Sequence, residues 1–250
     1  MDKNEFILKR VRELSSIAYQ RDIVTFTDFL SLDEQNTIRT MELCTQGIRT
    51  EFSGGYQHAE RQMAAFHSDA LNFTWNYPIT CLYIEAKSLK FSEELTHRDF
   101  LGALLHLGIE RSVLGDIIVK EKCCWVFAQN KICSFVIDNL AKVKHTYVTV
   151  TEVSDIASLP EPNLIPVTGT CSSVRLDSLI ALAFQSSRSS MVSNIEGGLV
   201  FVNGKQVLSN GYVPKPGDII SVRHKGRFLY DGTTHQTKKG RTGVRLLRYE

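Results

Sequence analysis

The stretch "RLDSLIALAFQSSRSSMVSNIEGGLVFVNGK", residues 175–205, carries the clearest structural pattern in this chain of 250 residues. Its first part predicts a helix, because apolar residues recur every three to four positions. These apolar positions are Leu176, Leu179, Ile180, Ala183 and Phe184. Ser187 is a suitable N-cap for a second helix, which Gly197-Gly198 would end by supplying a left-handed cap. Two short consecutive helices are therefore expected here.

The residues that follow these helices predict a small sheet. Val200 and Val202 alternate with other residues, and Asn203-Gly204 is a strong signal for a tight hairpin turn. "PKPGDIISVR" then adds a Pro-Gly turn and a strand from Ile219 to Arg223. We expect a helix–turn–helix packed on a small twisted sheet.

Residues 79–153 alternate between strand and helix patterns in the order βαββαβ. This order predicts a ferredoxin-like split βαβ sandwich, an arrangement that RNA-recognition modules also use. Trp125 and Phe127 lie two apart on one face of a strand, but the strand lacks the Gly- and Phe-containing signature of those modules. We interpret the two rings as core residues, with base stacking as the alternative.

Residues 1–75 predict a helical region. Apolar periodicity marks a helix over residues 2–20, and Ser31 with Glu34 forms a capping-box pattern at the start of another. Gly54-Gly55 marks a turn, which is either structural or part of a functional loop.

The proline-containing stretch "SLPEPNLIPVTGT", residues 158–170, reads as a linker. The predicted fold class is therefore α+β, with four successive parts. They are a helical region (1–75), a ferredoxin-like domain (76–157), a linker (158–172) and a C-terminal domain with a basic extension (173–250).

The net charge of +2 conceals a strong asymmetry along the chain. From Val174 to the end there are 12 Lys and Arg against 5 Asp and Glu, whereas the preceding residues hold 17 against 22. Segregated basic charge of this kind is typical of a nucleic-acid-binding unit. The charge pattern predicts RNA or DNA as a partner of the C-terminal part.

Several other classes of protein are disfavoured by composition. The charged N-terminus "MDKNEFILKRVRELSS" has no apolar export core, and no long apolar run occurs, so we expect a cytoplasmic protein without a signal peptide or membrane span. The six cysteines form no C-x-x-C pair and the seven histidines form no cluster with them. We therefore expect free thiols, no metal site and no cofactor.

The C-terminal residues resemble a known RNA-binding motif. The stretch quoted above, together with "KPGDIISVR", is similar to the αL motif, named for the small-subunit ribosomal protein in which it was first described. With "GGYQHAER", "HRDFLGALLHLGIER", "GDIIV" and "TKKGRTGVRLLRY", the chain resembles the bacterial YlmH family over nearly its full length. The resemblance implies binding to structured RNA, ribosomal or transfer, with the large ribosomal subunit as the target.

The resemblance also implies which residues meet RNA. They are Arg175 before the first helix, Ser187, Arg188 and Ser189 at the start of the second, and Lys205, Arg223, Lys225 and Arg227 as an extension of that surface. Asp177 is expected to cap free N–H groups and orient Arg175. The second helix carries Met191-Val192 where many family members have a further basic residue.

The tripeptide Arg175-Leu176-Asp177 also occurs in pseudouridine synthases, where the aspartate is catalytic. Here Val174 precedes it and it opens the αL module itself, so we favour a non-enzymatic binder. The sequence "HRDFLGALL" resembles a kinase catalytic loop but has Leu104 where that loop needs a metal-binding Asn. The function expected is RNA binding in rescue or quality control of stalled translation. The alternatives are an RNA-modifying enzyme and a cell-division interaction protein.

Overall fold

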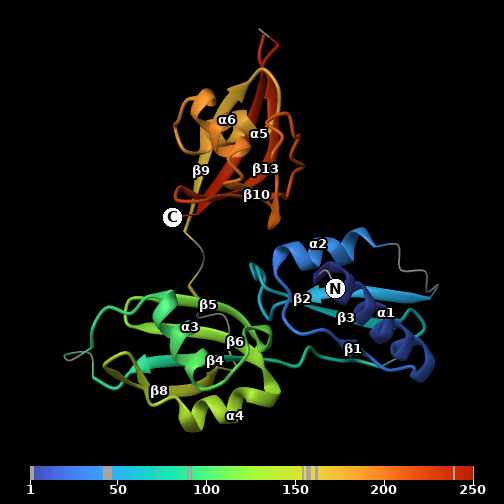
Figure 1. The fold of residues 1–250 in the computed structure, drawn as a ribbon, viewed down its shortest axis with the longest axis vertical. Coiled ribbons are helices and arrows are strands. Elements are labelled where there is room, and N and C mark those ends of the chain that lie inside the picture. Colours follow the sequence, from blue (N-terminus) through green and yellow to red (C-terminus); the bar gives the residue numbers. More distant parts are fainter. Residues whose placement is uncertain are drawn as a thin grey trace. The chain divides into compact units, whose positions relative to one another are not determined.

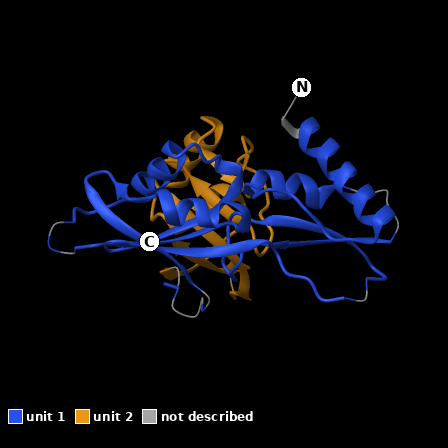
Figure 2. Ribbon diagram, turned by 90° about the horizontal axis from the view of Figure 1, so that it is seen from below, with its two compact units in different colours: residues 1–160 blue, residues 161–250 orange. Residues whose placement is uncertain are grey.

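The computed structural model describes residues 3–41, 47–71, 73–88, 90, 92–153, 155, 159–160, 163–238 and 240–249. The chain divides into two compact units, residues 1–160 and residues 161–250 (Figure 2). Each unit has hydrophobic clusters of its own, so each is described by itself below.

The N-terminal part of the first unit combines two helices with a sheet. It contains α1 (Lys3–Arg21), β1 (Thr25–Phe26), α2 (Leu32–Thr40), β2 (Ile48–Ser53) and β3 (Met63–Ser68), with antiparallel strands in the order β1-β3-β2. The capping box of Ser31 and Glu34 is confirmed. The two helices agree with the helical region predicted for residues 1–75, but the three-stranded sheet was not predicted. Most residues of β3, whose sequence is MAAFHS, are buried. The strand therefore lacks the alternation of apolar and polar residues by which a strand is recognised in a sequence.

The rest of the first unit is a split βαβ sandwich (Figure 1). Its elements are β4 (Ile79–Ala86), α3 (His97–His106), the 3₁₀ turn η2 (Arg111–Val113), β5 (Leu114–Lys120), β6 (Cys123–Gln129), α4 (Asn130–Asn139), β7 (Lys142–Val143) and β8 (Thr146–Val153). The antiparallel sheet has the order β5-β6-β4-β8-β7. The expected ferredoxin-like topology is confirmed. The predicted boundary at residue 157 lies outside the described residues.

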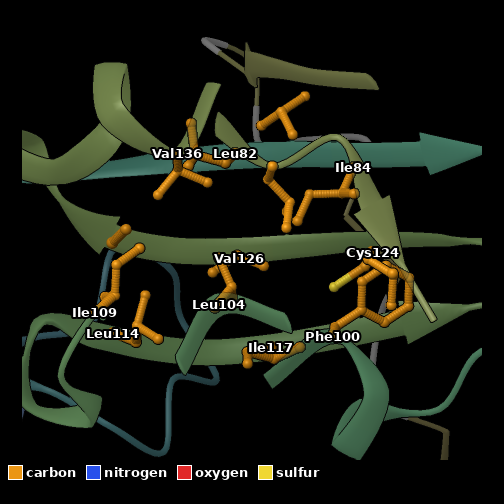
Figure 3. Close-up of a cluster of buried hydrophobic side chains, with 14 of the residues drawn as sticks. Leu82, Ile84, Phe100, Leu104, Ile109, Leu114, Ile117, Cys124, Val126 and Val136 are labelled. Atoms are coloured by element: carbon orange, nitrogen blue, oxygen red, sulfur yellow. The ribbon is translucent and has the colours of Figure 1, made fainter. Parts of the chain in front are cut away.

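One face of this sheet is covered by α3 and α4. Leu82, Ile84 and Val126 from the strands meet Phe100 and Leu104 from α3 and Val136 from α4 (Figure 3). These side chains are fully buried. Because successive side chains of a strand point to opposite faces, their neighbours in β4 and β6, including Tyr83, Trp125 and Phe127, lie on the other face of the sheet.

The second unit packs two helices on a six-stranded sheet. It contains β9 (Leu164–Cys171), α5 (Leu176–Ala183), α6 (Arg188–Glu196), β10 (Val200–Val202), β11 (Lys205–Gln206), β12 (Ile219–Val222), β13 (Gly226–Gln236) and β14 (Thr242–Tyr249). The strand order is β11-β10-β12-β13-β14-β9. The two helices and the Asn203-Gly204 turn, in which both residues have positive φ, confirm the sequence prediction.

The predicted linker is wrong for residues 164–171. These residues form β9, which pairs with β14 along its whole length. Pro166 made the segment read as a loop, but β9 is an edge strand, where a residue without an N–H group is tolerated. Residues 226–249, predicted as part of a basic extension, form the long β13–β14 hairpin.

Candidate RNA-binding surface

Asp177 and Arg188 join the starts of the two helices of the second unit. Oδ2 of Asp177 accepts hydrogen bonds from Arg188 Nε at 3.0 Å and from Arg188 Nη2 at 2.5 Å. Oδ1 accepts from the backbone N–H of Ser178 at 2.8 Å. The Asp177 side chain is 8% exposed and that of Arg188 is 50% exposed. Asp177 therefore holds the Arg188 guanidinium in place while leaving half of it open to solvent.

This ion pair corrects one expectation. The sequence predicted that Asp177 would orient Arg175, whereas its hydrogen bonds are to Arg188 and Ser178. Arg175 occupies the N-cap position of α5 and is exposed. Within the part of the chain that the structure describes, its side chain has no hydrogen bond or ion pair. Arg175 is thus available to an external anion.

The start of α6 combines a helix N-terminus with hydroxyl groups. Ser187 is the N-cap, and its Oγ accepts from the backbone N–H of Ser190 at 3.3 Å. The hydroxyls of Ser187 and Ser189 lie 3.2 Å apart, and both residues are exposed. A helix N-terminus carries partial positive charge, and a guanidinium can donate two hydrogen bonds to one phosphate. Together with Arg188, this end of α6 can bind a phosphate.

Met191 explains the departure from the family pattern on the second helix. It is fully buried, in the same cluster as Ile195 and Leu179. A basic side chain at this position would have to enter the core. Cationic contacts through α6 are therefore concentrated at its first residue, Arg188.

The basic residues of the sheet do not form one surface. Lys205 pairs with Val202, whose buried side chain faces the helices, so Lys205 lies on the helix side of the sheet. Arg223 and Arg227 lie on the opposite side, where their guanidinium groups are 5.1 Å from the Phe201 ring and 4.4 Å from the Tyr249 ring. The expectation that Arg223 and Arg227 continue the surface of the helices is wrong. Lys225 is exposed in the turn between β12 and β13.

Arg248 is a cation on the helix side that sequence reasoning missed. It pairs with the buried Phe228, and its Nη1 donates to the carbonyl oxygen of Ala183, at the end of α5, at 3.5 Å. The alternation of Val244, Leu246 and Arg248 in β14 was the signal that could have placed it there. The helix side thus presents Arg175, Arg188, Lys205 and Arg248.

The aromatic residues of the ferredoxin-like sheet belong to the core, as the sequence predicted. Trp125 is 8% exposed and Phe127 is 1% exposed. Tyr56 from the N-terminal part stacks on Phe127 with ring centres 4.7 Å apart. Gly55, at a φ of +93°, lies so close that an added Cβ would be 2.7 Å from the Phe127 ring. The Gly54-Gly55 turn therefore has a structural role, because it lets this segment approach the sheet.

Asp116 fixes the same segment to β5. Its carboxylate accepts from the Tyr56 hydroxyl at 2.8 Å and from the backbone N–H groups of Glu60 at 2.7 Å and Arg61 at 3.0 Å. Burial raises the pKa of Asp116, against the opposing effect of the Tyr56 hydrogen bond. Since the Arg61 guanidinium donates to the carbonyl oxygens of Phe29 and Leu114, this network has a structural role.

The described residues also bear on other kinds of site. No group of three potential metal ligands occurs there. Cys81, Cys123, Cys124, Cys133 and Cys171 are free thiols, as expected, and Cys44 lies outside the described residues. None of the described helices is long and apolar enough to cross a membrane.

Comparisons with known proteins agree with this organisation. A family model described as "Putative RNA-binding domain in YlmH" matches residues 75–156, and the S4 domain model matches residues 174–220. The chain is 27% identical to the ribosome-associated protein quality control protein P2 of Bacillus subtilis (strain 168), over 99% of this chain and 95% of that protein.

A solved structure shares the fold of part of the chain. The cell division protein YlmH from Streptococcus pneumoniae has a TM-score of 0.53 and 17% sequence identity, covering 64% of this chain and 96% of that one. The chain therefore resembles YlmH proteins, since a YlmH RNA-binding domain model matches its middle, an S4 domain model matches its C-terminal part, and its relative is similar over almost the full length.

Proposed function

We propose that this protein binds structured RNA of the large ribosomal subunit, in the cytoplasm, and acts in quality control of stalled translation without catalysing a reaction. The relative from Bacillus subtilis is named as a ribosome-associated quality control protein and is similar over almost the whole chain. The observation that carries the proposal is the helix side of the S4 domain. There a half-exposed Arg188 is held at a helix N-terminus beside the exposed Arg175.

Within this proposal the residues have different roles. Arg175, Arg188, Ser187 and Ser189 contact phosphates or riboses, and Asp177 positions Arg188. Lys205 and Lys225 extend the surface at its edge, and Arg248 adds a cation at the end of α5. Arg223 and Arg227 are not part of this RNA-binding surface in the proposal, because they lie on the other side of the sheet.

The first test is a charge reversal with a matched control. Arg175→Glu should weaken binding to purified large ribosomal subunits at least tenfold, because it replaces a charge-assisted contact with repulsion. Arg227→Glu makes the same charge change on the opposite side of the sheet and should weaken binding less than about threefold. Binding is measured by co-sedimentation. Equal losses in the two variants, or no binding by the parent protein, would contradict the proposal.

The enzymatic alternative assigns Asp177 a catalytic role. Its carboxylate is buried, and both oxygens already accept hydrogen bonds from Arg188 and Ser178. This environment favours a positioning role over catalysis. Mass spectrometry of RNA incubated with the protein provides the test, since formation of pseudouridine that is lost in Asp177→Asn would support the enzyme.

A further inference from the structure

The ferredoxin-like domain needs a surface for RNA other than its sheet face. Residues 75–156 match a family model described as a putative RNA-binding domain, and the inference that follows rests on the proposed function, RNA binding. The usual route for a domain of this fold would be base stacking on exposed aromatic rings of the sheet. Here Trp125 and Phe127 are buried, and Tyr56 already stacks on Phe127. An RNA strand must therefore contact the domain elsewhere.

A groove of about 690 Å³ lies on the helix-bearing side, between α3 and β7. Arg98, Asp99, Gly102, Ala103 and His106 of α3 line one wall. Residues 139–142, Lys144 and Tyr147 line the other. All of the residues that line the groove belong to the first unit.

The charged side chains of this groove are mostly basic. Arg98, Lys142 and Lys144 line it, and Asp99 is the one carboxylate among its lining residues in the described chain. Asp99 accepts from the Thr96 N–H at 2.8 Å and the Thr96 hydroxyl at 2.7 Å, and it pairs with Lys144 Nζ at 2.9 Å. These bonds lower the pKa of Asp99 to about 2. With Asp99 and Lys144 paired, Arg98 and Lys142 leave the groove net positive.

Gly102 gives independent support for a ligand. It lies in the interior of α3, where glycine lowers helix stability relative to alanine. A Cβ added at Gly102 would meet nothing within 4 Å, so packing inside the domain does not require glycine. Glycine in such a place permits the backbone of a ligand to come close to the helix. Arg98 precedes Gly102 by four residues, on the same face of the helix.

We propose that this groove binds the sugar–phosphate backbone of an RNA strand. In this proposal Arg98 and Lys142 contact phosphates, and the open space next to Gly102 accommodates the RNA backbone. Tyr147, a residue that is 57% exposed, offers a ring at the edge of the groove, with Lys142 Nζ 4.2 Å from its centre. Exposed aromatic rings beside cations are typical of surfaces that hold single-stranded RNA. The ligand class is therefore RNA rather than protein.

The main test fills the groove without disturbing the fold. Gly102→Leu in the full-length protein should weaken binding to purified Bacillus subtilis large ribosomal subunits about tenfold or more. Its melting temperature should stay the same or rise, because leucine is a better helix former and the new Cβ has free space. Ser134→Leu, at an exposed position of α4, is the matched control and should bind as the parent does. Unchanged binding by Gly102→Leu would overturn the groove proposal.

A second variant tests the phosphate contact itself. Arg98→Gln should make the plot of log affinity against log salt less steep, with the negative slope smaller in magnitude by about one. This is the change that the loss of one phosphate contact predicts. Lys131→Gln, which removes an exposed cation from α4, should leave the slope unchanged. An unchanged slope in Arg98→Gln would count against the proposal.

These experiments distinguish failure of the groove proposal from failure of the proposed function. If Arg175→Glu weakens binding and the groove variants do not, the proposed function stands and the groove proposal fails. If the parent protein does not bind the subunits, the proposed function itself fails.

A benzophenone side chain at position 147 identifies the class of ligand, since photo-crosslinking to ribosomal RNA supports the proposal. Crosslinks to ribosomal proteins alone, or none, would overturn it.

Discussion

At the scale of single residues, the carboxylate of Asp177 determines how Arg188 is presented. A free arginine at a helix start would sample many conformations, whereas two hydrogen bonds from its guanidinium to one buried carboxylate oxygen restrict it. The part of the guanidinium that stays exposed can then bind a phosphate with less loss of conformational entropy. Under the proposed function, we therefore expect Asp177 to contribute to RNA binding by positioning Arg188, without contacting RNA itself.

This geometry predicts the effect of Asp177→Asn. An amide oxygen is a weaker acceptor for a guanidinium, so stability should fall by about 1 kcal/mol, a small value because Arg188 is half exposed. RNA affinity should fall roughly three- to tenfold, although the variant removes a negative charge near the RNA. Urea denaturation and filter binding measure the two effects. An affinity equal to or above that of the parent would show that repulsion by Asp177 outweighs its positioning of Arg188.

At the scale of secondary-structure elements, β9 determines where the S4-containing unit begins. Its residues pair with β14 throughout, and Cys171 is buried against the helices while Val167 packs on the same cluster. A fragment that starts at Val174 would lose these contacts and expose the edge of β14. Unpaired strand edges promote association between molecules.

The fragment boundary therefore has a measurable consequence. Residues 161–250 should fold on their own, while residues 174–250 should be less stable by at least about 2 kcal/mol, because burial and strand pairing are lost. Chemical denaturation of the two fragments gives the difference, and sedimentation velocity detects any association. Equal stability and equal monomer content would mean that β9 adds little to this unit.

At the scale of the whole molecule, basic charge is distributed over surfaces in both units. The helix side of the second unit offers Arg175, Arg188, Lys205 and Arg248, and the groove in the first unit adds Arg98 and Lys142. A chain that uses two surfaces gains affinity through effective concentration, even when each contact is weak. The acidic balance of residues 1–173 therefore does not exclude the first unit from RNA binding.

Binding should accordingly depend strongly on salt. If about six phosphates are neutralised, log affinity should fall with log salt at a slope of roughly −4. Residues 161–250 alone should give a shallower slope and weaker binding, since they lack the contribution of Arg98 and Lys142. Filter binding from 50 to 300 mM salt, about the range over which such contacts are lost, provides the measurement. A flat response would contradict the electrostatic basis of both proposals.

The sequence by itself determined the parts of this protein that depend on short-range physics. Helical periodicity from Leu176 to Ile195, the Ser187 cap and the Asn203-Gly204 turn act over a few residues, and so does the strand and helix order of residues 79–153. The S4 motif could be recognised for the same reason. Arg175 and the start of α6 were placed correctly because helix caps are local features.

The tertiary structure decided everything that depends on contacts between distant segments. The pairing of β9 with β14, the three-stranded N-terminal sheet and the stacking of Tyr56 on Phe127 join residues that are far apart in the chain. The Asp177–Arg188 pair and the separation of Arg227 from the helix side depend on how two helices and a pleated sheet pack together. No local pattern encodes such contacts, since they form only when burial of distant apolar faces offsets the entropy of closing the chain between them.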